Sequence, residues 1–311
     1  MHKDILKQER ILAIRGPMKF RALFFIFLQT VTFFNLYCND PVETYRKETV
    51  SPQASEEYDN DFIALVEMIY GEGLLSQGGL KSIDEMFYGI DLNGLKLLDL
   101  GSGLGMYDIY LAKHNRVEIV GLDPQEVLVQ RANVNLEKSK NDLKGHVSFL
   151  LMRNPNNLNE FSDNYFDIVF SKESILHVPH EVKESYFKEI YRVLKPNGKI
   201  IIMDWMHSGP IYTANTRKMM EMDGIVYQLS TPFEYDKILK KAGFNNIELI
   251  DTTCQHAKIS QQNIDTIISI EDKIKSRFGE DVYNYSLESW TYQRDAFKTR
   301  DLLTGIFKAS K

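Results

Sequence analysis

Short apolar runs alternate with longer amphipathic segments along most of the chain. In the segment 58–70 the apolar residues Phe62, Leu65, Val66 and Ile69 recur at spacings of three and four, which is typical of a helix with one buried face. Runs of four to six mainly apolar residues between turn signals indicate strands. We expect strands at 96–100, 117–122, 147–151, 166–170, 199–203, 247–251 and 302–308. Helices are expected at 58–70, 80–87, 105–114, 125–138, 180–193 and 233–242, with polar helices filling about 260–301.

Strands and helices that take turns along a chain favour a parallel sheet covered by helices on both faces. The sequence therefore predicts an α/β fold of the Rossmann-like, doubly wound type. Its sheet has seven strands and is mostly parallel.

The first 55 residues differ from this pattern. Residues 22–39 carry no charge, and the 21 residues before them carry six Lys and Arg against two acids. This plan is typical of a secretory signal or a membrane anchor; the alternatives are a wrongly extended start and an apolar helix that docks on the domain. Residues 40–55 have two prolines and no periodicity, which indicates a linker. We therefore expect a leader at 1–39, a linker at 40–55 and one domain at 56–311.

Composition narrows the class of protein. Hydrophobic residues make up 43% and charged residues 26% of the 311 residues, which is typical of a globular protein and excludes a multi-span membrane protein. The net charge of −6 argues against nucleic-acid binding through a basic field. The two cysteines, Cys38 and Cys254, exclude a disulfide framework and a cysteine zinc cage. His177 and His180 have metal-like spacing but no third ligand, so we predict no metal.

A glycine-rich turn after the first predicted strand is the strongest chemical signal. Gly101, Gly103 and Gly105 follow the apolar strand directly and open a helix, so backbone N–H groups can approach a ligand without steric hindrance. Asp99 adds a carboxylate that can hold an ammonium group. Asp123 ends the next strand, where an acid can accept both hydroxyls of a ribose. These features favour a nucleoside-bearing cofactor, and the G-x-G-x-G spacing disfavours a nicotinamide dehydrogenase.

The segments 97–105, 117–123, 167–178 and 193–199 resemble the class I S-adenosylmethionine-dependent methyltransferases. This resemblance implies S-adenosyl-L-methionine as the cofactor. One position departs from that family, which usually has an acid after the third strand to bind the adenine amino group. Residues 152–156 contain no acid, and Asn154 is the candidate substitute. The alternative is a non-catalytic nucleoside- or amine-binding protein that has kept the fold.

Outside this core, Glu57-Tyr58, the segments 70–79 and 171–177, and the terminal 305–311 resemble the phosphoethanolamine N-methyltransferases over residues 56–311. The resemblance implies that Tyr58 and His177 form the catalytic pair. It also implies that Ser76 closes over the methionine end of the cofactor and that Lys172 faces the cofactor. His177 is chemically suited to remove a proton from an ammonium substrate.

The predicted acceptor residues are Glu173, Trp205 and Tyr227. Glu173 precedes His177 by four residues, so a helix there would place both on one face, where the carboxylate can hold the substrate cation. The resemblance implies a phosphate clamp in which Tyr227 is retained and Trp205 replaces a tyrosine. Ile225 and Gln293 replace the two cations of that clamp. Trp205 can instead hold a methylated ammonium group by cation–π contact, and Arg217, Arg294 or Lys298 can compensate for the lost cations.

These observations predict an S-adenosylmethionine-dependent N-methyltransferase acting on a small, phosphoethanolamine-like amine. Because this cofactor is supplied inside cells, we expect a cytoplasmic enzyme, associated with membranes if residues 22–39 form an anchor. Export is the alternative, because a basic flank before an apolar segment orients the rest of the chain away from the cytoplasm.

Overall fold

The computed structural model describes residues 59–153, 157–209, 212–223 and 227–311. The predicted leader, the linker, Tyr58 and Asn154 lie outside these ranges. Within them, no helix is long and apolar enough to cross a membrane. Whether residues 22–39 form an anchor therefore stays a prediction.

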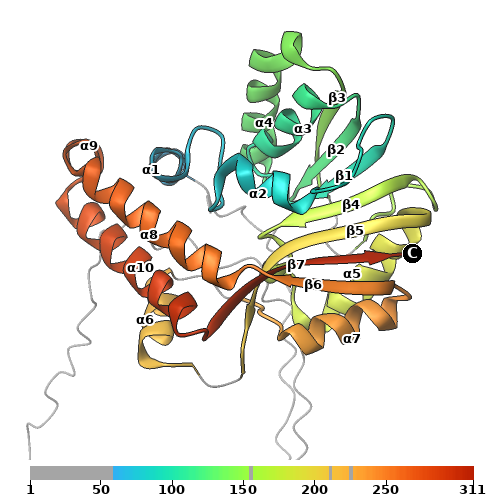
Figure 1. The fold of residues 1–311 in the computed structure, drawn as a ribbon. Helices are drawn as coiled ribbons and strands as arrows, with labels where there is room; N and C mark the ends of the chain where they lie inside the picture. Colours follow the sequence, from blue (N-terminus) through green and yellow to red (C-terminus); the bar gives the residue numbers. More distant parts are fainter. Residues whose placement is uncertain (1–58, 154–156, 210–211, 224–226) are drawn as a thin grey trace, which may run out of the picture.

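A single seven-stranded sheet forms the centre of the molecule, as the sequence predicts (Figure 1). Its strand order is β3-β2-β1-β4-β5-β7-β6, and β7 alone runs antiparallel to its neighbours. The strands are β1 (Lys96–Leu100), β2 (Glu118–Asp123), β3 (His146–Leu151), β4 (Phe166–Lys172), β5 (Leu194–His207), β6 (Asn245–Asp251) and β7 (Leu302–Ser310). The chain reverses its direction of winding between β1 and β4, and the carboxyl ends of parallel strands at such a point form a crevice where ligands bind.

Ten α-helices and two short 3₁₀ helices, η1 and η2, lie in the described ranges. Those that cover the sheet are α2 (Gly79–Met86), α3 (Met106–His114), α4 (Glu126–Ser139), α5 (His180–Val193) and α7 (Pro232–Ala242). The others are α1 (Asn60–Tyr70), α6 (Ala214–Asp223), α8 (Thr253–Ser269), α9 (Glu271–Phe278) and α10 (Glu280–Lys298). The 3₁₀ helices are η1 (Lys140–Asp142) and η2 (Ile175–His177).

The strand side chains alternate between two apolar cores. In β1, Leu98 and Leu100 pack with α5 and α7 on one face, while Leu97 packs with α2, α3 and α4 on the other. All three leucines are fully or almost fully buried, and each such side chain contributes about 1.5–3 kcal/mol to folding. This double burial explains why the strands appear in the sequence as unbroken apolar runs.

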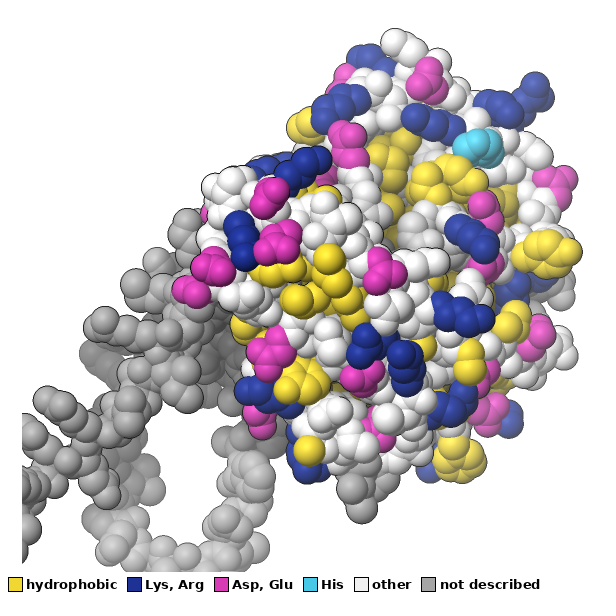
Figure 2. Space-filling model, turned by 60° about the vertical axis from the view of Figure 1, so that its left-hand side comes forward, with side chains coloured by type: hydrophobic (Ala, Val, Ile, Leu, Met, Phe, Trp, Pro, Cys, Tyr) yellow, Lys and Arg dark blue, Asp and Glu magenta, His cyan; other side chains and the backbone are white. Residues whose placement is uncertain are grey.

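A separate helical layer stands beside the carboxyl edge of the sheet. The helices α8 and α10 run side by side, and α1 lies near them on the left of Figure 1. Leu65 and Ile69 of α1 pack against Ile267 of α8, Ile274 of α9 and Val282 of α10. Figure 2 turns this side forward and shows acidic and basic side chains interspersed with apolar ones. The absence of a nucleic-acid partner stays a prediction.

Two elements differ from the sequence-based expectation. The strand expected at 199–203 extends over Leu194–His207. It pairs with β7 from Lys199–Ser310 to His207–Leu302, and Leu194 pairs with Phe166 of β4. The helix α6 was not expected, since its apolar residues are only Ala214 and three methionines. Contacts with other elements stabilise this helix, because Met219 is fully buried against the α8 and α10 side of the fold.

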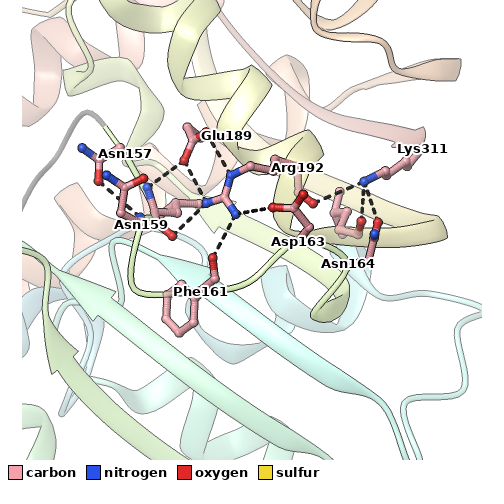
Figure 3. Close-up of polar contacts among 10 residues, drawn as sticks. Asn157, Asn159, Phe161, Asp163, Asn164, Glu189, Arg192 and Lys311 are labelled. Carbon is pink, nitrogen blue, oxygen red and sulfur yellow. Dashed lines mark hydrogen bonds and ion pairs between the residues drawn. The ribbon is translucent and has the colours of Figure 1, made fainter.

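Arg192 of α5 fixes the connection between β3 and β4 (Figure 3). Its guanidinium donates to the carbonyl oxygens of Phe161 at 2.9 Å and Leu158 at 3.0 Å. It also pairs with Asp163 at 2.8 Å and Glu189 at 2.9 Å. The planar group thus satisfies two backbone acceptors of an irregular segment that has no ladder partners.

We expect Arg192→Met to lower the free energy of unfolding by about 1–3 kcal/mol, because it leaves these carbonyl groups and carboxylates without their charged donor. Lys188→Met is the matched control on the same helix, since Lys188 pairs with Glu184 across a surface-exposed contact of 2.8 Å. Urea denaturation measures both variants. Equal stability of the two would show that the connection does not depend on Arg192.

Candidate functional site

The glycine turn adopts the backbone that its sequence predicts. Gly101, Gly103 and Gly105 have φ angles of 88°, 54° and 76°, a region that other residues rarely enter. A Cβ on Gly101 would lie 2.1 Å from the Ser174 hydroxyl oxygen, so no larger residue fits this position. Gly105 caps the N-terminus of α3. The N–H groups of Gly101, Ser102, Gly103 and Gly105 bond to acceptors within the protein, and the turn places the positive end of α3 at the cavity.

Asp123 lies at the end of β2, across this turn. Its Oδ2 accepts the N–H of Gly103 at 2.9 Å and its Oδ1 accepts the N–H of Gln125 at 2.9 Å. Burial raises its pKa to about 6, although the two N–H donors lower it. The carboxylate is thus ionised at neutral pH, fixed in orientation, and retains lone pairs for hydroxyl donors of a ligand.

Asp99 and Asp108 form a buried acid pair beneath the glycine turn. Their exposed fractions are 2% and 0%, and the two side chains are close enough to shift each other's pKa. Burial, and for Asp99 also the nearby Asp108 carboxylate, raises both pKa values, that of Asp108 to about 8. Both carboxyl groups therefore keep their protons at neutral pH. Asp99 Oδ1 and the Ser102 hydroxyl have no partner among the described residues, and both residues line the cavity.

Lys172 and Glu173 lie at the end of β4, on the far side of the crevice. The Lys172 Nζ donates to the Ser76 hydroxyl at 2.8 Å, to the Gln77 carbonyl oxygen at 2.8 Å and to Glu173 Oε1 at 3.1 Å. Burial lowers the Lys172 pKa, but Glu173 and Tyr107 together raise it by more, so the ammonium persists. Glu173 has a φ of 52°, and this left-handed conformation turns the chain away from the strand.

The expectation of one helix face for Glu173 and His177 is wrong. Only Ile175–His177 is helical, as a single 3₁₀ turn, so Glu173 lies outside it. Both residues nevertheless line the cavity. The His177 ring is accessible from the cavity, whose surrounding walls still disfavour an added charge. This desolvation, together with the Lys183 charge, lowers the His177 pKa to about 4, so the ring is a neutral imidazole at pH 7.

Aromatic side chains form the wall next to His177. The Tyr227 ring lies 6.3 Å from the His177 ring and 5.6 Å from the Trp205 ring, inclined at 30° to each. Further along, the Trp290 Nε1 donates to the Tyr70 hydroxyl at 3.1 Å. This wall can therefore accept a cation or an apolar group.

The structure brings most of the predicted residues to this one cavity. Those that line it are Ser76, Asp99, Gly101, Gly103, Asp123, Lys172, Glu173, His177, Trp205 and Tyr227. Gly105 is not among the lining residues and forms the N-cap of α3. Tyr58 and Asn154 lie outside the described residues, and all of the roles assigned from the sequence stay predictions.

Sequence reasoning named Gln293 of α10 as a clamp position but missed the other residues that this helix contributes. Tyr285, Ser289 and Gln293, spaced by four residues, turn one face of this helix to the cavity, and Trp290 joins them. Gln293 accepts a hydrogen bond from Gln77 Nε2, and the Gln77 Oε1 accepts from Ser260 at 3.0 Å and Asn263 at 2.8 Å. In the sequence, the spacing of Tyr285, Ser289 and Gln293 indicates only that they share a helix face. No local signal shows that this face turns toward the sheet.

The chain is similar to known methyltransferases in sequence and fold. Residues 98–202 match the family model described as a methyltransferase domain. Phosphoethanolamine N-methyltransferase 3 of Arabidopsis thaliana is 29% identical over 256 residues, which are 82% of this chain and 50% of that protein. Phosphoethanolamine N-methyltransferase of Plasmodium falciparum is 26% identical over 264 residues, 83% of this chain and 94% of the relative. The chain thus spans about half the length of the plant relative but nearly all of the second.

A solved structure supports the fold. Phosphoethanolamine N-methyltransferase 2 of Haemonchus contortus, in complex with phosphomonomethylethanolamine and S-adenosylhomocysteine, matches with a TM-score of 0.72 and 24% identity. The match covers 81% of this chain and 57% of that one. The chain therefore has the fold of the class I S-adenosylmethionine-dependent methyltransferases. Its sequence is similar to the phosphoethanolamine N-methyltransferases.

The acid pair predicts an unusual dependence of stability on pH. Unfolded Asp108 loses its proton near pH 4, whereas the folded protein holds that proton up to a pKa of about 8. The folded state binds more protons between these values, so the free energy of unfolding falls as the pH rises, by at most about 1.4 kcal/mol per unit. We expect Asp108→Asn to gain in Tm relative to the unsubstituted protein between pH 5 and pH 8. Asp142→Asn, on an exposed side chain, is the control. A Tm difference that stays constant over this range would contradict the raised pKa of Asp108.

Proposed function

We propose that the protein is an S-adenosylmethionine-dependent N-methyltransferase that acts on a small amine. The observation that carries the proposal is the convergence of the glycine turn, Asp123 and His177 on one cavity. The names of the relatives support the reaction class, and they make phosphoethanolamine the first acceptor to assay.

The residues present fit the cofactor. Asp123 binds the ribose hydroxyls with the lone pairs that its two backbone bonds leave free. Asp99, with one buried oxygen that lacks a partner among the described residues, receives the ammonium of the methionine end. Gly101 and Gly103 keep the backbone open to the ligand, and the N-terminus of α3 favours the carboxylate. Ser76 and Lys172 form the wall at the same end, and Asn154 takes the adenine amino group.

When bound, S-adenosylmethionine supplies an electrophilic methyl group on a sulfonium, whose S–C bond breaks as the amine nitrogen forms the new N–C bond. The chain must hold the nitrogen in line with that methyl group and keep its lone pair free. His177, a neutral imidazole at pH 7, accepts the proton that the ammonium substrate loses. Tyr58 orients this ring. Glu173, Trp205 and Tyr227 hold the substrate cation beside it.

The domain comprises residues 56–311, after a leader at 1–39 and a linker at 40–55. It acts in the cytoplasm, where the cofactor is supplied, and residues 22–39 provide a membrane association if they form an anchor.

Isothermal titration with S-adenosylmethionine tests the cofactor site. We expect Asp123→Ala to weaken binding about 10- to 100-fold, because hydrogen bonds to a charged group contribute about 1.5–3 kcal/mol. Asp142→Ala removes an exposed carboxylate far from the turn and should bind as the unsubstituted protein does. No heat of binding at millimolar cofactor would refute the proposed function.

Formation of S-adenosylhomocysteine in the presence of amines tests the catalytic pair. We expect His177→Ala to lower kcat by about 100-fold or more and to leave the cofactor Kd within about twofold, because a general base acts on the chemical step. Tyr58→Phe should lower kcat in the same way. His180→Ala, an exposed histidine three residues away, is the control. Unchanged turnover in both His177→Ala and Tyr58→Phe would remove the pair from the mechanism.

A further inference from the structure

From residue 59 onward, every Lys and Arg side chain can be checked for its position relative to the cavity. The internal segments outside the described ranges are Asn-Pro-Asn, Pro-Ile and Gly-Ile-Val, so they contain no Lys or Arg. Every Lys and Arg from 59 to 311 is therefore described. Among the described residues that line the cavity, Lys172 alone is a Lys or Arg.

Lys172 has no donor left for a ligand. Its three ammonium hydrogens are directed to Ser76, to the Gln77 carbonyl and to Glu173, all within 3.1 Å. The side chain is 2% exposed and ion-paired with Glu173. A dianionic group placed here would have to displace the Glu173 carboxylate or lie against it.

The cations that the sequence offers as substitutes lie elsewhere. Arg294 donates to Asp295 at 2.8 Å and to Gln261 at 2.8 Å, and Arg217 donates to the Tyr212 carbonyl oxygen. Lys298 is exposed at the end of α10. None of the three lines the cavity.

The groups that do line the acceptor end suit a cation and a neutral tail. Trp205 and Tyr227 present ring systems 5.6 Å apart beside His177, and Glu173 supplies a carboxylate. Ser289 and Gln293 of α10 are neutral hydrogen-bonding groups. An ammonium or methylated ammonium group is attracted to such rings. A phosphate requires charge-assisted donors to offset its loss of hydration.

We propose that the acceptor of this enzyme is a small unphosphorylated amine, an alkanolamine or alkylamine. Its cationic nitrogen lies between Glu173 and the Trp205–Tyr227 rings, and its other end meets the neutral groups of α10. The inference rests on the proposed methyl transfer and narrows its substrate class.

Tryptophan fluorescence tests the inference without turnover, because the chain has two tryptophans, Trp205 and Trp290, and both line the cavity. The full-length protein, saturated with S-adenosylhomocysteine, is titrated with choline and with phosphocholine. We expect choline to bind at least about tenfold more tightly. Equal or tighter binding of phosphocholine would overturn the inference, as would the absence of a fluorescence change with either probe.

A substitution that adds the missing charge sharpens the test. Gln293→Lys places an ammonium on the cavity face of α10 and should improve phosphocholine binding relative to choline by about tenfold or more. Gln262→Lys adds the same charge on an exposed position of α8 and should leave the ratio unchanged. An unchanged ratio in Gln293→Lys as well would show that a cation at this position does not set the preference.

Turnover separates this inference from the proposed function. S-adenosylhomocysteine formation is compared for ethanolamine and phosphoethanolamine, and for their monomethyl forms. Higher kcat/KM for the unphosphorylated member of each pair supports the inference. Higher kcat/KM for the phosphorylated member overturns it but leaves the methyltransferase function standing. No product from any amine, together with no cofactor binding, refutes the proposed function itself.

Discussion

A single buried ammonium group joins the sheet to the layer that closes its crevice. Lys172 extends from the end of β4 and binds the Ser76 hydroxyl and the Gln77 carbonyl, which belong to the segment between α1 and α2. The Gln77 side chain continues the network to Ser260 and Asn263 of α8 and to Gln293 of α10. Because a buried charge must keep its partners, these contacts fix where the helices stand relative to the strands.

The cavity that results has two electrostatic halves. At the glycine turn, Asp123 is ionised and both acids of the Asp99–Asp108 pair are protonated, so that end presents one carboxylate and neutral carboxyl groups to a ligand. At the other end Glu173 is balanced by Lys172, and the remaining walls are aromatic or neutral. A site built in this way favours a positive group beside the aromatic rings, and its only described Lys or Arg, Lys172, is already paired, so it offers little to a dianion.

The individual strands and the glycine turn could be predicted because their signals are local. Buried parallel strands need continuous apolar runs, and the left-handed backbone at Gly101, Gly103 and Gly105 requires glycine. Helix ends followed local rules as well. Gly243 stops α7 with a φ of 109°, and Thr231 with Glu234 forms a capping box at its start. Elements held by distant partners were harder to predict, as the long β5 and the helix α6 illustrate.

The sequence by itself determined the fold class, the order of the chemical signals along the chain and the acidic and glycine residues that approach a cofactor. Only the tertiary structure decided that Glu173 reaches the cavity without a helix, that Gln77 links α8 and α10, and that Lys172 directs all three of its hydrogens to groups within the protein. The reason is physical. Backbone conformation and burial patterns act over a few neighbouring residues, whereas the partner of a buried charge is set by how distant elements pack.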